Sequence, residues 1–195
     1  MAWQTEKGKW VYADSNVRSQ TGDEADSSTD GQDGTITATA VAKPKRSKSS
    51  SATASWSATY TGKRTWKAAG PNDPPTEETM PFSVNYTLPN WMVAVVAVEG
   101  ETATASAFGS IALQINGINK DVQTVIQRTL GAPPSETLPK THATQAVSID
   151  LAPYKHTADL TYGVTITVSA SASRTGESSS GNSIANISCT VNDPP

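Results

Sequence analysis

The stretch LTYGVTITVSASA, residues 160–172, alternates apolar and polar positions from end to end. A period of two is typical of a β-strand with one face in a protein core and the other in water. At roughly 3.3 Å per residue, such a strand spans about 40 Å. Its apolar face becomes thin where Ala170 and Ala172 replace larger side chains. We expect a neighbouring copy of the chain to cover that thin end.

The same alternation recurs along the chain and predicts an all-β protein. A continuously apolar run favours a central strand that is covered on both faces. About nine or ten strands at this spacing are typical of an antiparallel two-sheet sandwich, either jelly-roll-like or immunoglobulin-like. The alternating segments are residues 35–42, 52–60, 82–88, 102–115, 146–151, 160–172 and 183–191, and the apolar run is Trp91–Val98.

Two turns and one ambiguous segment complete the predicted set of elements. Asn116-Gly117 predicts a tight hairpin turn, and Thr61-Gly-Lys63 reads as a turn between two strands. The apolar residues of 119–130 fit a helical stripe, whereas its β-branched residues fit a strand. We favour the strand because the rest of the chain is β.

Composition makes the core depend on a few large side chains. Ala, Ser and Thr together make about 38% of the chain, and small side chains bury little area. We therefore expect the sandwich to gain stability from assembly or from a partner. The large residues expected to form the core are Trp56, Trp66, Phe82, Tyr86, Trp91, Phe108, Ile111, Leu113, Tyr162 and Ile166.

The first 34 residues differ from the rest and predict an extended N-terminal arm, followed by one sandwich domain over 35–195. The arm is rich in Asp, Gly and Ser, so alone it has too little apolar surface to become ordered. We expect another subunit to hold it, with the basic loop at 43–48 as one possible partner for its acids. The candidate assembly residues are Trp3, Trp10, Tyr12, Asp23, Asp26, Asp30, Asp33, Lys43, Lys45, Arg46 and Lys48.

Catalytic and metal-binding patterns are missing from the sequence. The two histidines, His142 and His156, lie in expected loops, and no Gly-x-Ser-x-Gly sequence accompanies them. The acidic stretch lacks the spacing of an EF-hand, and no His/Cys cluster suits zinc. The single cysteine, Cys189, allows no intrachain disulfide. It shares the apolar positions of its alternating segment with Ala185, Ile187 and Val191, so we expect a small buried side chain. We predict no enzyme activity, no metal and no cofactor.

Net charge and hydropathy limit the partners. A formal charge of −3 argues against general nucleic-acid binding. No apolar signal-peptide region begins the sequence, and its longest apolar run is too short to span a bilayer. We expect neither a nucleic-acid nor a membrane partner. The expected partners are copies of the chain itself and other structural proteins of one assembly.

These observations favour a non-enzymatic structural protein that assembles with itself into a larger particle or filament. A virion or phage component fits a chain without an export signal, and a surface filament or sheath subunit fits the Ala/Ser/Thr composition. The expected location is a virion or an extracellular, cell-surface assembly. The alternative is a carbohydrate-binding or adhesin-like sandwich module that holds a sugar ligand on exposed aromatic residues.

Overall fold

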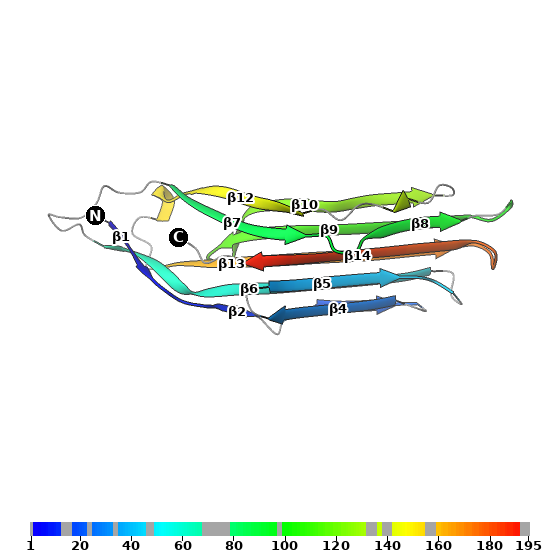
Figure 1. Ribbon diagram of the computed structural model, residues 1–195, viewed down its shortest axis with the longest axis horizontal. Helices are drawn as coiled ribbons and strands as arrows, with labels where there is room; N and C mark the ends of the chain where they lie inside the picture. Colours follow the sequence, from blue (N-terminus) through cyan, green and yellow to red (C-terminus); the bar gives the residue numbers. More distant parts are fainter. Residues whose placement is uncertain are drawn as a thin grey trace.

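The chain forms a sandwich of two antiparallel seven-stranded sheets in its described part, which confirms the predicted fold class. The strands of both sheets run along the long axis of the molecule (Figure 1). The computed structural model describes residues 2–12, 17–22, 25–32, 35–45, 49–67, 79–96, 99–131, 136–137, 142–154 and 159–191.

Sheet A is built on β6, β13 and β9, whose registers place their alternating residues opposite one another. Three short strands pair in turn with one edge of β6, and β10 forms the other edge of the sheet. The strands are β1 (Ala2–Glu6), β2 (Trp10–Tyr12), β3 (Val17–Thr21), β6 (Ser49–Lys67), β13 (Leu160–Arg174), β9 (Ala103–Ile115) and β10 (Ile118–Gly131).

Sheet B is centred on β14, which pairs along its whole length with different partners. One side pairs with β5, and β4 follows as the edge strand. The other side pairs first with β8 and then with β7, which are extended by β11 and β12 respectively. The strands are β4 (Ala25–Gln32), β5 (Thr35–Ala42), β7 (Thr79–Thr87), β8 (Met92–Val96), β11 (Glu136–Thr137), β12 (His142–Asp150) and β14 (Ser180–Val191), with a 3-10 turn, η1, at Ala152–Tyr154.

The turn predicted at residues 61–63 is wrong, because β6 continues through it as one 19-residue strand. The chain between β1 and β2 passes directly over Gly62, where the Gly8 amide donates to the Tyr60 hydroxyl at 3.0 Å. A Cβ on Gly8 would overlap the Gly62 backbone. Gly62 therefore permits a close approach of two strands and does not end one.

The expectation that Trp91–Val98 is covered on both faces is also wrong for residues 91–96, and residues 97–98 lie outside the described part of the chain. Within β8, Val93 and Val95 are buried, whereas Val96 is 54% exposed. The alternation shows that only one face of β8 packs into the core. Trp91, expected in the core, is half-buried at its margin.

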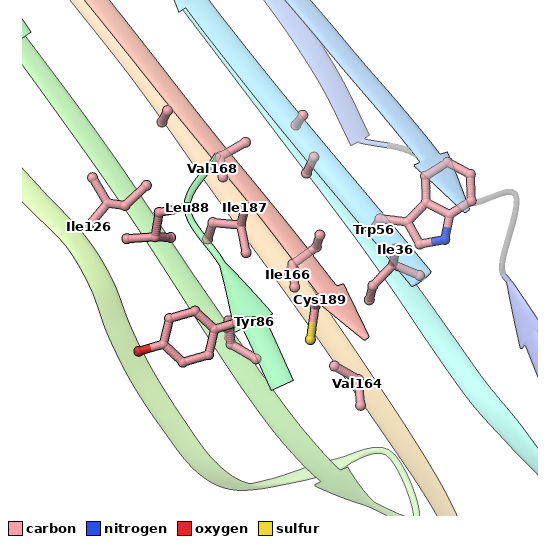
Figure 2. Packing of buried hydrophobic residues seen from close by; sticks show 14 of the residues in the cluster. Ile36, Trp56, Tyr86, Leu88, Ile126, Val164, Ile166, Val168, Ile187 and Cys189 are labelled. Atoms are coloured by element: carbon pink, nitrogen blue, oxygen red, sulfur yellow. The ribbon is translucent and has the colours of Figure 1, made fainter. Parts of the chain in front are cut away.

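The core is thick at one end of the sandwich. Tyr162 packs there against Tyr60 and Phe82, with ring centroids 6.3 and 5.7 Å apart, and its hydroxyl donates to Met80 Sδ at 3.3 Å. In the middle of the sandwich, Ile166 and Val168 of β13 lie beside Ile187 and Cys189 of β14 (Figure 2). Trp56 and Tyr60 face this core, as their strand parity predicted.

The opposite end is thin, and the chain covers it without a second copy. Ala170 and Ala172 are 1% and 4% exposed, which contradicts the expectation that a neighbour must shield them. Sheet B approaches so closely that a Cβ on Gly181 would lie 2.6 Å from the Thr104 carbonyl oxygen. The Ser183 hydroxyl donates to the Ser106 carbonyl across the same gap. Small residues therefore close this end by bringing the two sheets together.

Candidate assembly surfaces

The aromatic residues of the N-terminal segment lie on strands of the same chain. Trp3 pairs through its backbone with Trp66, and Tyr12 with Ala58. The Trp10 ring packs 5.4 Å from the Tyr60 ring, at the edge of the core. Trp10 thus anchors β2 to its own sandwich, and its indole Nε1 is buried without a hydrogen-bond partner.

Of the described acidic candidates, Asp26 lies at the end of the β4–β5 ladder next to Lys43, whereas Asp30 lies farther along β4, opposite Thr37. Asp26 and Asp30 are exposed on β4, where Ala25 pairs with Ala42. Lys43 comes directly after β5, at the end of the ladder where β4 begins. The side chain of Lys45, two residues later, is exposed. The remaining candidates, Asp23, Asp33, Arg46 and Lys48, lie outside the described residues.

The described parts of residues 1–34 supply edge strands to both sheets. β1, β2 and β3 pair with β6 in sheet A, and β4 pairs with β5 in sheet B. The Gln20 side chain donates to Asp26 Oδ1 and Ser27 Oγ, both at 3.3 Å, and so ties the corner between β3 and β4. Sequence reasoning placed an arm here and missed these strands.

The edge strands β4 and β10 differ in the regularity of their pairing. The β4–β5 ladder runs for eight residues without a register shift, and β4 ends the described order of sheet B. By contrast, the edge strand β10 is bulged at Lys120 and Val125. Bulges disturb the row of backbone groups that a new strand would join. The β4 edge is therefore the more regular template for strand addition.

The outer surface of sheet A is an array of hydroxyl groups, which we call the hydroxyl face. It comprises the outward-facing residues among 49–59 of β6, 163–173 of β13, 104–114 of β9 and 119–131 of β10. Neighbouring strands are bridged by side-chain hydrogen bonds. These bonds join Ser57 to Thr165 at 2.8 Å, Ser55 to Thr167 at 3.1 Å, and Ser171 to Ser106 and Ser173 to Thr104 at 2.7 Å each.

The hydroxyl face carries almost no charge. The outward-facing positions of its β6, β13 and β9 segments are all uncharged. On β10, Asp121 and Arg128 pair with the inward-facing residues Leu113 and Ala107, and Lys120 sits in a bulge. Three apolar side chains interrupt or flank the polar rows: Phe108 is 38% exposed, Val122 55% and Val11 44%.

A groove of about 400 Å³ opens between the edges of β10 and β12, beside η1. Its lining includes Ile118, Val147 and Tyr154, and the Lys120 ammonium lies 5.0 Å from the Tyr154 ring centroid. The Asp150 carboxylate accepts a hydrogen bond from the Ala152 amide at 2.9 Å, so it caps η1. Both polar groups contact residues of η1.

Gln145 joins the two sheets close to this groove, a role that its sequence pattern did not indicate. Its buried amide nitrogen donates to Asp121 Oδ2 at 2.8 Å and to the Ile111 carbonyl at 3.3 Å. The sequence alone does not show that this Gln is buried, so only the structure reveals the link.

The remaining reactive groups are Cys189 and the two histidines. Cys189 is fully buried, as predicted, and burial raises the pKa of its thiol to about 12. That thiol stays protonated in the folded chain well above neutral pH. The backbone of His142 lies in β12, not in the loop expected for it, and His156 lies outside the described residues.

Among the described residues, no group of three or more His, Cys, Asp or Glu side chains is placed to hold a metal ion. The described part of the chain also contains no helix of the length and hydropathy needed to cross a membrane. Comparison of the chain with protein-family models, with curated proteins and with solved structures gave no match.

Proposed function

We propose that this chain is a non-enzymatic structural subunit that assembles with copies of itself into a larger particle or filament. The observation that carries the proposal is the regular, exposed edge of β4. A strand edge presents unpaired N–H and C=O groups, which another chain can join by strand addition. Asp26 and Asp30 point from this strand toward water, so a partner strand with basic residues would fit beside it.

A virion component or a subunit of a surface filament or sheath is consistent with such an assembly. The proposed location is accordingly a virion or a cell-surface structure. Copies of this chain are the proposed partners, together with other structural proteins of the same assembly. The uncharged hydroxyl face of sheet A and the long strands support a building block whose main task is to present surfaces.

Two proline variants in β4 test the role of its edge. The amides of Ser28 and Gly31 are three residues apart, so they point to opposite edges of the strand. Proline removes the N–H at either site. In one variant the lost N–H faces β5, and the unfolding temperature should fall. In the other it faces the free edge, and we expect a stable protein that no longer assembles in sedimentation and electron microscopy.

The proposal fails if the variant that keeps the wild-type unfolding temperature assembles as the wild type does. It also fails if the unmodified chain never forms more than monomers. Circular dichroism and thermal unfolding of both variants identify which edge each proline has altered, so the two effects can be separated.

A second candidate function is a carbohydrate-binding or adhesin-like module. Phe108 favours it, because an exposed aromatic ring beside serine hydroxyls and the exposed Gln127 can stack on a sugar while polar groups bind its hydroxyls. A glycan array with the wild type and Phe108→Ser tests this function. Binding of a neutral glycan that the substitution abolishes would support it, and an array without any signal would count against it.

A further inference from the structure

We infer that the hydroxyl face of sheet A docks against the hydroxyl face of a second copy, so that two sandwiches stack face to face. This inference rests on the proposed self-assembly and assigns it a second surface besides the β4 edge. A surface that meets its own copy forms a twofold, self-complementary interface, which is the commonest arrangement in homo-oligomers.

The size of the face suits a stable dimer. Four strands about 4.8 Å apart, crossed by six rows about 6.7 Å apart, cover on the order of 750 Å². A standard protein interface buries about 800 Å² on each partner. The sheet therefore offers enough area for one specific contact, without any contribution from loops.

The chemistry of the face suits contact with itself. A surface without charge can approach a copy of itself without like-charge repulsion, which would otherwise cost several kcal/mol. Serine and threonine also lose less side-chain entropy on contact than Lys, Glu or Arg do. The lateral bonds between Ser57 and Thr165 and between Ser171 and Ser106 already satisfy part of the hydrogen-bonding capacity, so fewer groups need new partners after water leaves.

Apolar side chains on the same face provide anchors. Phe108 and Val122 of this face, and Val11 of the adjoining strand β2, are three of the five large hydrophobic residues that are exposed in the described part of the chain. Phe108 lies in the interior of the array, between Ser169 of β13 and Gln127 of β10. A central aromatic ring surrounded by small polar groups is the arrangement in which a few residues carry most of an interface's affinity.

The outer face of sheet B is the less suitable partner. It includes exposed Asp26 and Asp30 on β4, which would lose water on contact without a basic counterpart on the hydroxyl face. A sheet A–sheet A pair avoids that cost. The two-sheet unit then becomes a four-layer unit, with the β4 edges left open for strand addition.

The test compares two matched threonines. Thr167 on β13 and Thr37 on β5 are both half-buried, outward-facing residues of inner strands, and each hydroxyl bonds a serine of a neighbouring strand at 3.1 or 3.2 Å. Thr167→Lys places a charge in the hydroxyl face, and Thr37→Lys places one in sheet B. Sedimentation of the full chain should show Thr167→Lys weakening dimer formation at least tenfold, about 1.4 kcal/mol, with Thr37→Lys unchanged.

Phe108→Ser is the second variant, because it removes the anchor without adding a charge, and it should also weaken the dimer. If the wild type assembles but the Thr167→Lys and Thr37→Lys variants have equal dissociation constants, the hydroxyl face is not the interface. The proposed role of the β4 edge would then still stand. A wild type that remains monomeric would overturn both proposals. A monomer that cosediments with an insoluble neutral polysaccharide through Phe108 would instead assign the face to glycan binding.

Discussion

At the residue scale, small inward-facing side chains determine how closely the two sheets pack. Gly109 of β9 leaves a space that Ile187 of sheet B and Ile126 of β10 fill, since a Cβ there would lie 2.8 Å from Ile187 Cδ1. Gly181 and Ser183 bring β14 still closer to β9 at the thin end. Glycine and serine thus let the two sheets approach closely, and the Ala-rich strands of the facing sheets can pack against each other.

Gly181→Ala should lower the free energy of unfolding by about 1–3 kcal/mol, because the added methyl group would lie 2.6 Å from the backbone carbonyl oxygen of Thr104 at a buried site. Gly131→Ala is the matched control, since a methyl group added at that exposed position would meet no atom within 4 Å. We expect the control to stay within about 0.5 kcal/mol of the wild type. Urea unfolding measures both, and an equal effect of the two substitutions would contradict this account of the packing.

Parity along the strands predicts the orientation of many single residues. Trp56, Tyr60 and Cys189 are buried as the alternation indicates. The expectation that Phe108 belongs to the core is wrong, because Phe108 lies on the polar face of β9 and is 38% exposed. The same rule could not foresee Gly62 or Trp10. Their positions depend on a neighbouring segment that is more than 40 residues away in sequence, and no local pattern records that contact.

At the element scale, β10 shows why a strand can resemble a helix in sequence. Its register shifts at Lys120 and Val125 each insert one residue and reverse the alternation. Apolar residues consequently recur at intervals of three or four, which is the helical spacing. The predicted strand is confirmed, but only the pairing with β9 reveals the bulges. The Asn116-Gly117 hairpin turn is also confirmed, with φ values of 51° and 74°.

The N-terminal strands escaped prediction because edge strands need little apolar surface. β4 turns Ala25 and Ser27 toward the interior and exposes Asp26, Ser28 and Asp30. Such a composition resembles that of a disordered linker. Backbone pairing with β5 supplies the order that the side chains do not encode.

Removal of residues 1–34 should therefore destabilise the fold as well as any assembly. The deletion uncovers the edges of β6 and β5. We expect a lower Tm, with about 2–4 °C lost for each kcal/mol, and aggregation that increases with concentration because two new edges are exposed. Thermal unfolding and light scattering measure these effects. A truncated chain with the wild-type Tm would show that these strands contribute nothing to the sandwich.

At the scale of the whole molecule, the sandwich combines the regular open edge of β4 with the uncharged hydroxyl face of sheet A. Addition of strands at β4 would extend sheet B sideways, and contact between hydroxyl faces would pair two sandwiches. Together these contacts can build an extended particle or filament from identical copies. The fold class could be predicted from alternation alone, whereas the two surfaces depend on which strands become neighbours.

Sedimentation velocity of the full, unmodified chain across a wide range of concentration tests self-assembly most directly. We predict dimers and larger species whose proportion increases with concentration. A single species with the mass of one chain at every concentration would rule out self-assembly.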